Sequence, residues 1–123
     1  MIGKNYIGGQ WVGGGAGELP VTDPATGALI QHQALASSAD VDAAVAAARA
    51  MVNSRALSGI RPVERGRMVR KMGDYLLAHC DEIARLLSQE SGKPLWEAVI
   101  EVEGSARYFE YYGNQAETVE GRS

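Results

Sequence analysis

The chain has 123 residues, of which 46% are hydrophobic, and its 12 basic and 15 acidic residues give a formal net charge of −3. This length suits one domain, and the charge gives no electrostatic reason to expect nucleic acid or an anionic membrane as a partner. No window approaches the run of about 20 apolar residues that a membrane span needs, and the N-terminus lacks the apolar core of a secretory signal, so we expect a cytoplasmic protein.

Glycines and short apolar runs dominate residues 1–36 and predict three short strands. The expected strands are "YIGGQWV" (6–12), a second one beginning at "LPVT" (19–22), and "ALIQHQAL" (28–35). The stretch "GGGAG" (13–17) is typical of a loop, and "DPATG" (23–27) is typical of a turn, because proline fixes φ and glycine tolerates the angles that turns demand. A sheet of such short strands needs cover from another element.

From residue 37 onward the pattern indicates helices. Ser37 with Asp40 is typical of a helix N-cap, and an apolar face follows it, formed by Val41, Ala44, Val45, Ala48 and Val52. Pro62 suits the first position of a second helical segment, whose apolar stripe runs to about Leu87. This segment is long for a globular helix, so we expect a break between Ala78 and Asp81. The predicted class is therefore α+β, with short N-terminal strands followed by three to five helices.

The pair Gly92-Lys93 raises the question of a phosphate-binding loop. Such a loop needs a glycine five positions before its Gly-Lys and a serine or threonine directly after the lysine. Here Leu87 and Pro94 occupy those positions. The sequence instead predicts a corner, in which Gly92 ends one helix and Pro94 begins the last one.

Three further candidates have ordinary structural explanations. Gly13 and Gly15 match part of a dinucleotide fingerprint, but Glu18 replaces its last glycine and no helix follows, which favours a plain loop. Cys80 lies on the apolar stripe, which favours core packing over a nucleophile. Glu97 and Glu101 share a helix face, and nothing marks them as buried, so solvated surface is the expectation.

Five stretches in order resemble the N-terminal segment of the NAD(P)-dependent aldehyde dehydrogenase superfamily. They are "YIGGQWV", "VTDPATGALI", "DVDAAVAAAR", the helical pair from Arg61 to Ala98 with its glycine-lysine-proline corner, and "ARYFEYYGNQAETVEG". Asp23 replaces the asparagine usual in the family's turn. The resemblance implies the N-terminal part of an α/β Rossmann-like cofactor domain, strand-rich over residues 1–36 and helical over 37–123, with the catalytic and oligomerisation parts absent.

The resemblance also implies a reaction for the full-length enzyme and a role for four residues of this chain. Full-length relatives oxidise an aldehyde to a carboxylic acid through a cysteine thioester, with NAD or NADP, and the residues that do so lie downstream of the matching segment. Val21 and Glu90 match positions that hold a monovalent cation in several relatives. The alternative is that Glu90 is an exposed residue near a helix end and binds no ion. Ile100 and Gly104 match positions that line the substrate tunnel in relatives. The alternative explanation for Gly104 is that another helix packs closely against it.

We therefore expect a structural fragment of an aldehyde dehydrogenase, inactive alone and binding no cofactor by itself. Its expected partners are the rest of its own chain, an aldehyde, and further copies in a homodimer or homotetramer. The alternative is a free-standing helical module that binds another protein. The sequence chooses neither the aldehyde nor between NAD and NADP, because the deciding residues are not among these 123.

Overall fold

The computed structural model describes residues 2–118. The chain divides into two compact units, Met1–Ser58 and Gly59–Ser123, so the first helix belongs with the strands. The combination of short N-terminal strands and four helices confirms the predicted α+β class. The last residues of the segment predicted to be helical, 119–123, lie outside the described part. No helix within residues 2–118 is long and apolar enough to cross a lipid bilayer.

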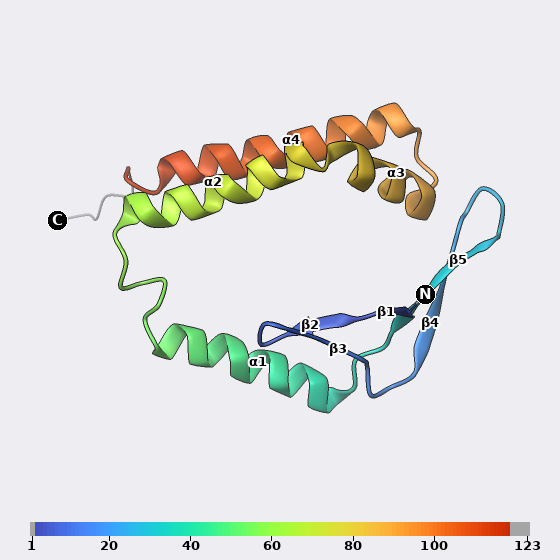
Figure 1. The fold of residues 1–123 in the computed structure, drawn as a ribbon, viewed down its shortest axis with the longest axis horizontal. Coiled ribbons are helices and arrows are strands. Elements are labelled where there is room, and N and C mark those ends of the chain that lie inside the picture. Colours follow the sequence, from blue (N-terminus) through green and yellow to red (C-terminus); the bar gives the residue numbers. More distant parts are fainter. Residues whose placement is uncertain (1, 119–123) are drawn as a thin grey trace. The chain divides into compact units, whose positions relative to one another are not determined.

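The first unit contains a three-stranded sheet and a separate hairpin (Figure 1). In the sheet, β5 (Leu29–Ala34) is central, pairing in parallel with β1 (Ile2–Gly3) and antiparallel with β4 (Glu18–Thr22). Pro20 is tolerated because β4 is an edge strand. The second and third strands were thus predicted correctly, whereas β1 was missed.

The prediction of a single strand over residues 6–12 is wrong. The stretch forms a hairpin of β2 (Asn5–Ile7) and β3 (Gln10–Val12), whose rings Tyr6 and Trp11 lie opposite each other. Gly8 and Gly9 form the turn with φ angles of 59° and 86°. Two consecutive positive φ angles characterise the two-residue turn that fits the twist of a hairpin, and two glycines adopt it without strain.

Helix α1 (Ser38–Asn53) begins at the predicted cap. The Oγ atom of Ser37 accepts a hydrogen bond from the backbone N–H of Asp40, and the Asp40 carboxylate accepts one from the backbone N–H of Ser37. This reciprocal capping box satisfies two donors that a helix start otherwise leaves unpaired. The same carboxylate oxygen accepts a bond of 2.9 Å from the N–H of Gly15, which fixes the glycine-rich loop to the helix start.

The second unit consists of α2 (Pro62–Ala78), α3 (Cys80–Ser91) and α4 (Leu95–Gln115). The predicted break is confirmed, because His79 separates α2 from α3 with a non-helical φ of −113°. Helices α2 and α4 lie side by side in opposite directions (Figure 1).

Small residues form the seam between α2 and α4. A Cβ atom on Gly66 would lie 2.3 Å from the carbonyl oxygen of Gly113, and one on Gly73 would lie 2.8 Å from that of Ala106. Only glycine at these positions permits this approach, and the close contact in turn gives dense van der Waals packing. Beyond the seam, α3 and α4 enclose a cluster of buried residues, Ala84, Ala98 and Val102.

Candidate functional site

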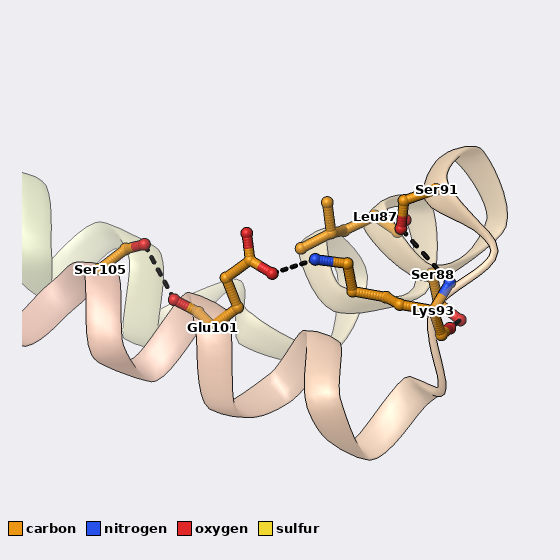
Figure 2. Close-up of polar contacts among 6 residues, drawn as sticks. All are labelled: Leu87, Ser88, Ser91, Lys93, Glu101 and Ser105. Atoms are coloured by element: carbon orange, nitrogen blue, oxygen red, sulfur yellow. Dashed lines mark hydrogen bonds and ion pairs between the residues drawn. The ribbon is translucent and has the colours of Figure 1, made fainter.

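The residues Gly92, Lys93 and Pro94 connect α3 to α4 and form the predicted corner (Figure 2). Gly92 caps α3 in the left-handed conformation, with φ of 73°, and its N–H donates to the carbonyl oxygen of Ser88. The Oγ atom of Ser88 donates to the carbonyl oxygen of Lys93 at 2.7 Å, which reaches across the turn. The prediction of a helix corner is confirmed.

The side chain of Lys93 also has a partner. Its Nζ atom forms an ion pair with Oε2 of Glu101, two turns into α4 (Figure 2). Lys93 therefore joins the corner to α4 through its ammonium group instead of presenting it to a phosphate. Glu101 was expected to be a solvated surface residue. Its side chain is partly exposed, but its carboxylate also forms this ion pair.

Cys80 occupies the first position of α3 and packs against the buried cluster of Ala84, Ala98 and Val102. Burial raises the pKa of its thiol, and the negative charges of Glu103 and Asp81 raise it further. A raised pKa keeps the sulfur protonated at neutral pH, and the thiol is a far weaker nucleophile than the thiolate. The structure thus agrees with a packing role.

The two residues predicted for a cation site lie in different units. Val21 is half-buried in β4 and opposes Gln31 of β5, while Glu90 is exposed near the end of α3. Within residues 2–118, no group of three or more histidine, cysteine, aspartate or glutamate side chains is arranged to hold a metal ion. The monovalent cation site stays a prediction.

The face of α4 that carries Ile100 and Gly104 points away from α2. Helical geometry places these two residues roughly opposite Val102 and Ala106, which are buried. Ile100 is 58% exposed, and a Cβ atom on Gly104 would meet no described atom within 4 Å. Among the described residues, then, nothing packs closely on Gly104, and the alternative explanation for this glycine is not supported by them.

Gly104 lies in a groove of about 440 Å³ on this face. Its other lining residues are Arg107, Tyr108, Tyr111 and Tyr112, which follow Gly104 at steps of three, four, seven and eight. Tyr108 and Tyr112 stack with ring centroids 6.5 Å apart, and Tyr111 meets Tyr112 edge to face at 5.2 Å. These four residues were not predicted to belong with Gly104, although their helical spacing places them near it on the same side of α4.

Comparison with known proteins gives consistent matches. The model of the aldehyde dehydrogenase family matches residues 11–123. N-succinylglutamate 5-semialdehyde dehydrogenase of Chromobacterium violaceum is 43% identical over 97 residues, which make up 79% of this chain and 20% of that protein. Mitochondrial succinate-semialdehyde dehydrogenase of Oryza sativa subsp. japonica is 34% identical over 119 residues, or 96% of this chain and 22% of that protein.

The fold agrees with solved structures. The crystal structure of PnpE in complex with nicotinamide adenine dinucleotide is 35% identical, with a TM-score of 0.92, and the match covers 99% of this chain and 25% of that one. The chain thus spans between about a fifth and a quarter of the length of the relatives that it matches.

Proposed function

Since the chain belongs to the aldehyde dehydrogenase family, we propose that it supplies the N-terminal part of the cofactor-binding domain of an enzyme that oxidises an aldehyde to a carboxylic acid with NAD or NADP. The observation that carries this proposal is the family match over residues 11–123, which is supported by the likeness of the fold to part of a solved structure about four times as long. The alternative of a free-standing interaction module is not favoured by these matches.

We propose that a dinucleotide does not bind to the described residues alone. The glycine-rich loop at residues 13–17 leads into strand β4 and not into a helix, so it lacks the helix N-terminus that binds a pyrophosphate. The ammonium group of Lys93 is paired with Glu101. NAD or NADP would therefore bind to parts of the enzyme outside this segment, together with the reactive cysteine, and no cofactor contact is assigned to residues 2–118.

In this proposal the segment has a positioning role. The seam of α2 and α4 is made by close contacts between backbones, and the corner at Lys93 ties α3 to α4. Such a rigid support suits a helix that forms one wall of the substrate tunnel through Ile100 and Gly104. Holding reactants in a fixed geometry lowers the entropic part of a barrier, so a precise wall contributes to the rate.

We further propose that Val21 and Glu90 hold a monovalent cation, as the family resemblance implies. The carbonyl oxygen of Val21 and the carboxylate of Glu90 are the kind of ligands that hard cations prefer. In the full-length enzyme, Glu90→Gln should then abolish any dependence of thermal stability on the choice of alkali cation. If the melting temperature of the variant still differed between potassium and lithium as much as that of the wild type, the proposed site would be refuted.

The remaining partners are part of the same proposal: the rest of the chain, an aldehyde, and further copies in a homodimer or homotetramer. A cytoplasmic location is also proposed, and it is compatible with a segment whose single cysteine needs no disulfide partner.

Purified full-length enzyme and purified residues 1–123 should be compared for aldehyde-dependent formation of NADH and NADPH. We expect turnover only with the full-length enzyme, because the reactive residues lie outside the segment. Turnover by residues 1–123 alone would contradict the positioning role, and a full-length protein that oxidises no aldehyde would contradict the function itself.

A further inference from the structure

The groove beside Gly104 carries a cation, Arg107, that has no partner among the described residues. Arg107 is exposed on α4, and it forms no ion pair or hydrogen bond with another described residue. Glu103 and Glu110 lie about one turn away on either side, but neither pairs with it. Arg107 also borders a second groove that contains Asp74, and no ion pair forms there either.

The rest of this groove is apolar and aromatic. The missing side chain of Gly104 leaves a hollow, and the rings of Tyr108, Tyr111 and Tyr112 line it. These tyrosines are 58% to 68% exposed within the described residues, which is unusual for three neighbouring rings on one helix face. The groove therefore combines a surface for a hydrocarbon body with one guanidinium group.

A guanidinium group presents its N–H donors in a planar fork that matches the two oxygens of a carboxylate. We propose that Arg107 binds a carboxylate at the far end of the aldehyde substrate, so that the enzyme acts on aldehydes that carry an acidic group. This proposal rests on the proposed function, because it takes the face of Ile100 and Gly104 as the tunnel wall. Arg107 is then a residue that determines specificity and touches no reacting atom.

The test compares two aldehydes of equal chain length in the full-length enzyme: glutaric semialdehyde, which ends in a carboxylate, and pentanal, which does not. We expect Arg107→Gln to raise KM for glutaric semialdehyde about tenfold, since a hydrogen bond to a charged group contributes about that factor in binding. The KM for pentanal and both kcat values should stay within about twofold. Arg107→Lys should restore part of the binding, because it keeps the charge but loses the fork.

Arg67→Gln is the matched control, because Arg67 is an exposed arginine on α2. It should change neither KM. The proposal is overturned if Arg107→Gln raises both KM values equally, or raises neither. If Arg107→Gln fails to fold, the wild-type enzyme still decides: added salt should raise KM for glutaric semialdehyde and not for pentanal, and equal salt effects would overturn the proposal.

These outcomes separate the two proposals. An enzyme that oxidises pentanal and glutaric semialdehyde without any effect of Arg107 refutes the carboxylate site alone. A full-length protein that oxidises neither these nor other aldehydes refutes the proposed function, and the carboxylate site with it.

Discussion

Gly66 in α2 and Gly113 in α4 face each other across the helix pair so closely that a Cβ atom on Gly66 would lie 2.3 Å from the carbonyl oxygen of Gly113. A backbone oxygen cannot rotate away, so Gly66→Ala must push the helices apart. We expect a loss of about 2 kcal/mol in the free energy of unfolding, because overpacking outweighs the roughly 1 kcal/mol that alanine gains in helix propensity. Urea denaturation followed by circular dichroism measures this loss.

Gly104→Ala is the matched control, since it makes the same chemical change in a helix where no described atom lies within 4 Å of the added Cβ. It should raise the free energy of unfolding by up to about 1 kcal/mol. Equal losses for both variants would show that the close seam is not what makes Gly66 necessary.

The corner at Gly92 predicts a second effect. Its φ of 73° is strained for a residue with a side chain, so Gly92→Ala should cost about 1 kcal/mol of stability. Gly92→Asn should cost less, because asparagine tolerates the left-handed region better. Thermal unfolding of both variants provides the measurement, and an alanine variant as stable as the wild type would refute the backbone explanation.

The ion pair between Lys93 and Glu101 should contribute little energy. The two side chains are 25% and 51% exposed, so solvent screens their attraction. A double-mutant cycle with Lys93→Met and Glu101→Gln should give a coupling energy below about 1 kcal/mol, and it should shrink as salt is added. A coupling well above this limit that persists in high salt would mean that the pair is effectively buried.

Asp40 predicts how stability depends on pH. Hydrogen bonds from the backbone N–H groups of Gly15 and Ser37, and from the hydroxyl group of Ser37, lower the pKa of its carboxyl group below the ordinary value of 3.8. A lowered pKa in the folded state means that the stabilisation is fully present above that ordinary value. It is lost as the pH falls through the folded-state pKa.

Replacing Asp40 with asparagine should therefore lower the melting temperature near neutral pH and flatten its fall in acid. Melting curves from neutral pH down to about pH 2 test this, with Asp42→Asn as the matched control on the same helix turn. If Asp40→Asn left the fall of the melting temperature in acid unchanged, other carboxyl groups would be responsible for that fall.

The features that were predicted correctly are local in the sequence. The cap at Ser37, the start at Pro62, the break at His79 and the corner at Gly92 each depend on a few adjacent residues with strong backbone preferences. The Gly-Gly hairpin was equally local, and a rule for two-residue turns would have identified it. By contrast, the approach of Gly66 to Gly113 spans the whole helical unit, so sequence spacing alone did not predict it.

The candidate site was only partly predictable for the same reason. The sequence indicated that Glu101 is surface, but its pairing with Lys93 depends on the angle of the corner. Two explanations stand for Gly104, because helical spacing does not say what lies beside a residue; among the described residues, no atom lies within 4 Å of a Cβ added there. The exposure of the tyrosines follows from which face of α4 packs on α2, and that choice is made by glycines and alanines whose partners are distant in the chain.

This division of α4 into two faces matters for protein engineering. Its closest contacts with α2 are made at Gly66, Gly73 and Gly113, while Ile100 and Gly104 lie on the opposite face, where Ile100 is 58% exposed. Libraries that randomise Ile100, Gly104 and Tyr111 should consequently retain a high proportion of folded members, which makes this face of α4 a practical starting point for varying the substrate preference that we propose for the full-length enzyme.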